Sequence, residues 1–163
     1  MKYATALRPL EVRGLLDQDA LLRALHEIAA HEERFTERFY EIFFERRPDT
    51  LSLFGSHSIV EREEMMRETL RALLALYEGE SWLAENLAAL GRSHWEYGVT
   101  TDMYDSLVDA LIDCSRDVLG DSLDDSSESS LRLALCEIAR QMSSAGEAAA
   151  RHYAAHSLQE PTL

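Results

Sequence analysis

Residues 91–104 read GRSHWEYGVTTDMY, and this stretch joins the end of one periodic segment to the start of the next. The apolar positions before it follow one helix face, with steps of four, three and four between Leu83, Leu87, Leu90 and His94. Gly98 marks a turn, and a helix that begins near residue 101 has Tyr104 in its first turn. We therefore expect His94 on the buried face of one helix and Tyr104 near the start of the following helix.

Helical spacing recurs through most of the chain, whereas strict period-two alternation is absent. Only three prolines occur, so long helices can run without interruption. A turn or helical corner follows Pro48, and residues 120–130 form an acidic, serine-rich connection. The periodic segments are about 19–31, 34–47, 60–78, 81–95, 101–119 and 129–154. The pattern predicts an all-α domain of five long helices plus short corner helices, and both bundle and globin-like packing satisfy it.

The length of 163 residues fits a single domain, with residues 1–18 as an N-terminal extension and residues 156–163 as a frayed tail. The first residues lack the apolar core of a signal peptide, and no stretch approaches the roughly 20 apolar residues that span a bilayer. The sequence therefore predicts a cytoplasmic protein without a membrane partner.

The net charge of −14 argues against nucleic acid as a partner, because an acidic surface repels a phosphate backbone. The two cysteines, Cys114 and Cys136, form no CxxC or Cys/His motif, which argues against zinc ribbons and covalent c-type haem. We expect both to be buried, reduced thiols.

His94 has two interpretations. A histidine on an apolar stripe is more often a core residue than a ligand. Tyr104 changes the balance, because its hydroxyl could reach back to the second imidazole nitrogen and fix the tautomer, as ligand histidines require. Tyr40 and Phe54 also have two interpretations each. Both could be core aromatics. Alternatively, Tyr40 donates its hydroxyl hydrogen to a bound oxygen atom and the Phe54 ring stacks on a flat ligand.

Other features of the sequence carry less chemistry. We expect solvated side chains at the remaining histidines, which are His26, His31, His57, His152 and His156. The sequence contains no Glu-x-x-His pair of the kind that builds di-iron sites, no Gly-rich phosphate loop and no GxSxG elbow.

Three stretches taken together resemble bacterial globins: FTERFYEIFFERRPDTLSLF at 35–54, MRETLRALLALY at 66–77 and LGRSHWEYGVTTDMY at 90–104. The resemblance is to the haem domain of flavohaemoglobins and to related single-domain globins, and it covers about residues 20–150. It depends on order and spacing, since Phe54 follows Tyr40 by fourteen residues and Tyr104 follows His94 by ten. The resemblance implies a globin fold that holds non-covalent haem b.

The resemblance also implies residue roles. His94 matches the proximal ligand of the iron, and Tyr104 matches the proximal tyrosine that hydrogen-bonds around it. Tyr40 matches the distal tyrosine that donates to bound dioxygen, which makes it the candidate catalytic residue. Phe54 matches the phenylalanine packed against the porphyrin.

The distal wall departs from the usual pattern. Met66 falls where a glutamine or histidine is usual, with Leu70 one turn further on, so this side of the pocket is expected to be apolar. Phe39 completes its lining. The haem propionates are expected to pair with arginines, for which the candidates are Arg62, Arg67 and Arg71.

The function implied by the resemblance is reversible binding of dioxygen or other diatomic gases such as NO and CO. Nitric oxide dioxygenation is a further activity, which needs an external reductant or reductase because we expect no reductase domain in this chain. The 54-residue separation of Tyr40 and His94 is also similar to that in globin-coupled sensors. The alternative is therefore a stand-alone gas- or redox-sensing domain, monomer or homodimer, that signals through a protein partner.

Overall fold

The computed structural model describes residues 9–55 and 58–157, and all the regular elements within these ranges are helical. The expected all-α class is thus confirmed. In chain order the elements are α1 (Pro9–Leu15), α2 (Gln18–Ala30), α3 (Glu32–Arg46), the 3-10 helix η1 (Pro48–Ser52), α4 (Ile59–Glu78), α5 (Leu83–Glu96), α6 (Thr101–Leu119), the 3-10 helix η2 (Gly120–Ser122) and α7 (Asp125–Ser157).

Local hydrogen bonds set the ends of α4, the helix that follows the η1 corner. The Ser58 hydroxyl accepts from the Glu61 N–H, and the Glu61 carboxylate accepts in return from the Ser58 N–H. Gly79 ends the helix with a φ of 74°, a left-handed conformation that suits glycine. The expected end at this glycine is confirmed.

Two expectations about helix number and bounds were wrong. The described residues contain seven α-helices rather than five long helices with corners, and α1 lies inside the expected N-terminal extension. Its Val12 is buried, and the Arg13 side chain donates to the carbonyl of Tyr77, so α1 is docked on the body. Helix α7 begins within the expected connection, because the Asp124 carboxylate accepts from the Ser127 N–H at its first turn. Of the expected tail, residues 158–163 lie outside the described residues, as does His57.

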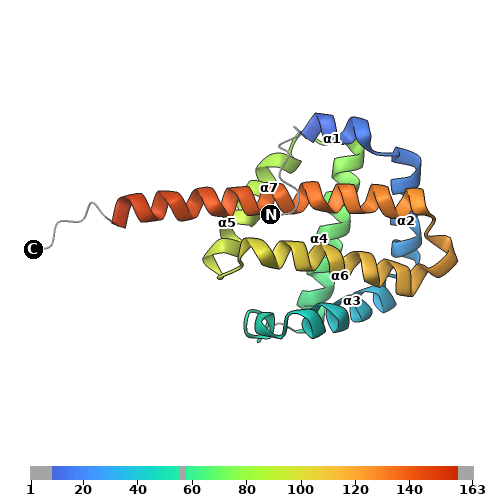
Figure 1. The fold of residues 1–163 in the computed structure, drawn as a ribbon, viewed down its shortest axis with the longest axis horizontal. Coiled ribbons are helices and arrows are strands. Elements are labelled where there is room, and N and C mark those ends of the chain that lie inside the picture. Colours follow the sequence, from blue (N-terminus) through green and yellow to red (C-terminus); the bar gives the residue numbers. More distant parts are fainter. Residues whose placement is uncertain (1–8, 56–57, 158–163) are drawn as a thin grey trace, which may run out of the picture.

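Helices α6 and α7 lie side by side through the middle of the molecule, and α3 packs on the other side of α6 (Figure 1). Helix α4 crosses behind them, and α2 packs against both α4 and α7. The core that these helices share includes Leu21, Ile28, Phe35, Leu73, Val108, Ile112 and Leu131. Within the described ranges, no helix combines the length and the apolar character needed to cross a membrane.

Helix α5, which carries His94, packs chiefly against α7 and touches α4 at few positions. The α5–α7 contact is so close that a β-carbon at Gly91 would overlap the backbone carbonyl of Met142. A β-carbon at Gly146 would in turn lie 3.1 Å from the carbonyl oxygen of Gly91 and from the β-carbon of Trp95. Two glycines therefore let the backbones of α5 and α7 approach each other.

The C-terminal part of α7 projects from the body of the molecule (Figure 1). Residues 151–156 are exposed, and the Tyr153 side chain is 67% exposed. This part of α7 is therefore helical and largely open to solvent, although the centroid of the Tyr153 ring lies 6.2 Å from that of the Trp95 ring on α5.

Candidate functional site

His94 lies in the last turn of α5, where its side chain is half-buried rather than buried. The buried positions of α5 are Leu83, Leu87 and Gly91. The sequence pattern predicts that His94 continues the buried stripe of Leu83, Leu87 and Leu90. It does not, because α7 approaches α5 most closely at Gly91 and the covered face of α5 is centred there. His94 consequently lies at the border between the covered face and the open side of the helix.

The His94 ring is oriented by a bond within its own helix. Nδ1 lies 2.8 Å from the backbone carbonyl oxygen of Leu90, one turn earlier. A carbonyl oxygen can only accept, so in this bond Nδ1 carries the hydrogen and the neutral ring has its lone pair on Nε2. This is the tautomer that a histidine needs in order to bind a metal through Nε2.

Tyr104 lies beside this ring, in the first turn of α6. The two ring centroids are 6.4 Å apart with an interplanar angle of 36°. The tyrosine is buried, and burial raises the pKa of its hydroxyl to about 12. The structure thus brings His94 and Tyr104 together as expected, but the partner of Nδ1 is Leu90 and not the tyrosine hydroxyl.

A second group of candidates surrounds Tyr40 on α3. This aromatic cluster joins α3 to the chain that follows η1, and its members are Phe39, Tyr40, Phe43, Phe44 and Phe54. The ring centroids of Tyr40 and Phe54 are 5.7 Å apart, and those of Tyr40 and Phe39 are 4.9 Å apart, both in edge-to-face arrangements. The structure thus brings these three candidate residues, Phe39, Tyr40 and Phe54, into one cluster.

The Tyr40 hydroxyl is directed at α4. It donates to the backbone carbonyl of Arg62 over 3.2 Å. The side chain is only 7% exposed, and burial raises the pKa of the hydroxyl to about 12 although the nearby Arg62 charge opposes this. Tyr40 is consequently protonated, and able to donate, throughout the physiological range of pH.

Arg62 is the residue of α4 that contacts this tyrosine. Its guanidinium carbon lies 5.6 Å from the centroid of the Tyr40 ring and 5.2 Å from that of Phe44. Its Nε is buried and has no hydrogen-bond partner among the residues that the structure describes. Arg62 lies one turn before Met66 on the same helix face, so the periodicity of α4 alone does not decide which of the two residues meets Tyr40.

Met66 and Leu70 lie deeper in the molecule. Met66 is 2% exposed, and together with Leu70 it lines a narrow apolar cavity of about 10 Å³ that is also bordered by Ile28, Phe35, Leu73 and Leu131. Both side chains therefore border the shared core, and at the Tyr40 hydroxyl the structure places Arg62 and not Met66. The turn of α4 that faces Tyr40 is thus one turn earlier than expected.

The other two arginines expected near the propionates have surface partners. Arg67 forms ion pairs with Glu32, Glu63 and Glu64 at 2.9–3.4 Å, and Arg71 pairs with Glu68. Each therefore already has a carboxylate to neutralise its charge.

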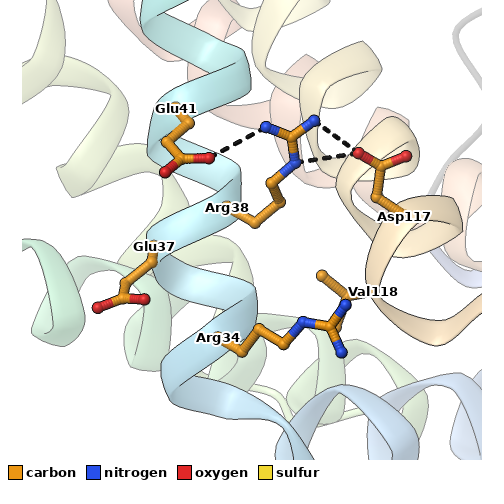
Figure 2. Close-up of a pocket in the computed structure, with 6 residues that line it drawn as sticks. All are labelled: Arg34, Glu37, Arg38, Glu41, Asp117 and Val118. Atoms are coloured by element: carbon orange, nitrogen blue, oxygen red, sulfur yellow. Dashed lines mark hydrogen bonds and ion pairs between the residues drawn. The ribbon is translucent and has the colours of Figure 1, made fainter.

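A cleft of about 310 Å³ lies elsewhere, between α3 and α6. Figure 2 shows Arg38 at its centre, bonded to Asp117 and Glu41, with Arg34 beside Val118. The cleft contains none of the residues that the sequence predicted for the site. It is lined by two arginines and three carboxylates, of which Arg38 is paired with Asp117 and Glu41, and we assign the cleft no role in the site.

The remaining candidates agree largely with expectation. The described histidines outside the site, namely His26, His31, His152 and His156, are exposed as expected. Cys114 is a buried free thiol whose pKa burial raises to about 12, whereas Cys136 is half-buried rather than buried. Among the described residues, no group of three or more His, Cys, Asp or Glu side chains could hold a metal ion.

No protein-family model matches the chain, and no curated protein matches it. The candidate site consists of two groups of side chains. His94 and Tyr104 lie on α5 and α6, while the aromatic cluster and Arg62 belong to α3, the chain after η1, and α4. One group offers a metal ligand of fixed tautomer, and the other offers a buried hydroxyl donor in apolar surroundings.

Proposed function

We propose that this chain is a haem-b globin that reversibly binds dioxygen or other diatomic gases. The observation that carries the proposal is the bond from His94 Nδ1 to the Leu90 carbonyl, which leaves Nε2 as a metal ligand on a half-buried ring. The exposed His156 makes the same bond within its helix, so it is the half-buried place beside the Tyr104 ring that distinguishes His94.

The chemistry of the surrounding side chains fits a haem. His94 would hold the iron, Tyr104 would lie beside the imidazole, and Phe54 and Phe39 would supply apolar contacts for the porphyrin. When bound, haem b supplies an iron with one coordination position for a diatomic gas. Helix α5 packs chiefly against α7 and touches α4 at few positions, so a haem bound between α4 and α5 would replace few contacts between these two helices.

Tyr40 is the proposed donor to the gas. Its hydroxyl is buried among aromatic rings, and on gas binding it would exchange the Arg62 carbonyl for the gas as its acceptor. A hydrogen bond to a ligand with negative charge contributes about 1.5–3 kcal/mol, which corresponds to roughly tenfold to hundredfold in affinity. Apolar surroundings strengthen such a bond because water does not compete for the donor.

Reversible binding is tested by optical spectra of the ferrous haem protein cycled between argon and air. We expect two distinct spectra that interconvert repeatedly on the same sample. Immediate and irreversible oxidation to ferric haem in air would contradict the proposal.

Nitric oxide dioxygenation is the enzymatic extension of this proposal. Nitric oxide, dioxygen and one electron give nitrate, and the electron must come from an external reductant. We expect stopped-flow mixing of the dioxygen-saturated ferrous protein with nitric oxide to give nitrate in a single rapid phase. Absence of nitrate would leave a gas-binding protein without this activity.

A second candidate function is gas sensing, and the arrangement of α5 and α7 favours it. The helix that carries His94 rests with its backbone against the helix whose end projects from the body (Figure 1). A shift of His94 on gas binding would therefore be transmitted to α7, which could signal to a partner. Hydrogen exchange of residues 147–157 should then differ with and without carbon monoxide, and unchanged exchange would contradict sensing.

A further inference from the structure

The buried Nε of Arg62 has no acceptor within the described fold. An N–H of a charged group that is buried without a partner destabilises a protein, and such groups in native structures call for an explanation such as a ligand or ion. This atom is the starting point of the inference.

The position of the guanidinium supplies the second observation. It lies 5.6 Å from the ring centroid of Tyr40 and 5.2 Å from that of Phe44, so attraction between the cation and the rings holds it at the aromatic cluster. The backbone carbonyl of the same residue accepts the Tyr40 hydroxyl at 3.2 Å. The Arg62 side chain and the proposed gas-binding hydroxyl of Tyr40 are thus neighbours.

The geometry points to Arg62 as a second donor beside Tyr40 that favours small anions, and gases that gain negative charge on binding, over neutral ligands. This inference rests on the proposed function, because the anion would bind a haem iron held by His94. A cationic donor in apolar surroundings stabilises an anion strongly, whereas it does little for a neutral ligand of the same size.

The other arginines of α4 do not offer the same chemistry. Arg67 and Arg71 are exposed and paired with glutamates, so their charge is already neutralised and screened by water. Arg62 combines a charge, a buried N–H without a partner and contact with Tyr40.

The test is titration of the ferric haem protein with fluoride, azide and neutral imidazole, followed by absorbance. In Arg62→Gln we expect fluoride and azide to bind at least about tenfold more weakly, while imidazole changes by less than about threefold. Arg62→Lys keeps the charge and should lie between the wild type and Arg62→Gln, and it carries the test if Arg62→Gln does not fold. Arg23→Gln removes one exposed charge from α2 and should behave as the wild type.

Three other outcomes would overturn the inference. Unchanged fluoride and azide constants in folded Arg62 variants would contradict it while leaving the proposed function intact. Loss of haem retention with unchanged anion constants would assign Arg62 to a haem propionate instead. A wild-type protein that takes up no haem would remove the proposed function and this inference together.

Discussion

At the scale of single residues, the hydroxyl of Tyr40 is the most consequential donor of the candidate site. It is buried against Phe39 and Phe54, and it is protonated at physiological pH because burial raises its pKa to about 12. A donor of this kind acts on a bound gas chiefly by slowing its release.

We therefore expect Tyr40→Phe to speed dioxygen dissociation from the ferrous haem protein by roughly tenfold to hundredfold, the equivalent of one hydrogen bond to a charged acceptor. The measurement is a stopped-flow dissociation rate with carbon monoxide as the competing ligand. Tyr97→Phe is the matched control, since Tyr97 is 78% exposed. Equal rates in Tyr40→Phe and the wild type would refute the donor role.

The two buried tyrosines also predict how stability depends on pH. Burial raises the pKa of Tyr40 and of Tyr104 to about 12, above the ordinary value of about 10. The folded state holds these protons more tightly than the unfolded state, so this stabilisation is complete below pH of about 10 and is lost as the pH rises to about 12.

We expect the free energy of unfolding from urea titrations to fall across this alkaline interval, and to fall less steeply in Tyr104→Phe. The exposed Tyr97→Phe control should keep the wild-type slope. The explanation fails if Tyr104→Phe and the wild type lose stability in parallel.

The residue scale also shows what sequence could and could not predict about the site. The contacts of Tyr40 with Phe54 and of His94 with Tyr104 were predictable, because each pair is separated by a short stretch with a clear turn. The residue of α4 that meets Tyr40 was not, because it depends on how the chain between η1 and α4 sets the rotation of the helix. One turn of difference placed Arg62 there instead of Met66.

At the scale of elements, the contact between α5 and α7 is the feature that positions His94. Gly91 and Gly146 remove the side chains that would keep the two backbones apart. The buried face of α5 is therefore centred on Gly91 and not on the stripe that ends at His94. The sequence pattern could not show this, because glycine has no apolar side chain that would mark a buried position.

We expect Gly91→Ala to lower the free energy of unfolding by about 1–3 kcal/mol, because a β-carbon there overlaps the rigid backbone at Met142. Fluorescence of the adjacent Trp95 during urea unfolding measures the change. Gly14→Ala is the control, since a β-carbon there meets nothing within 4 Å. Equal midpoints for Gly91→Ala and the wild type would show that α5 does not rest on α7 as described.

Helix bounds were predictable where periodicity was long and turn residues were clear. Helix α6 occupies 101–119 as expected, and α4 ends at Gly79 as expected. Helix α1 is seven residues long and lies outside any extended periodic pattern, so its docking through Val12 was not visible in the sequence. The start of α7 was missed because an aspartate and serine-rich stretch is compatible with both a connection and a capped helix start.

At the scale of the whole molecule, helices α2 to α7 all contribute side chains to one core, and α5 makes most of its contacts with α7. The proposed metal ligand and the helices that carry Tyr40 and Arg62 therefore belong to one packed body. The all-α architecture agrees with the sequence pattern, whereas the globin arrangement and the single-domain organisation stay predictions.

The most direct test of the central claim is a haemin titration of the purified protein, followed by the Soret absorption and repeated on His94→Ala. We expect the wild type to take up one haem per chain, and His94→Ala to lose this uptake or to lose the ferrous spectrum of a histidine-ligated haem. His26→Ala, which changes an exposed histidine of α2, should retain both. A wild-type protein that takes up no haem, or a His94→Ala variant with an unchanged ferrous spectrum, would contradict the account.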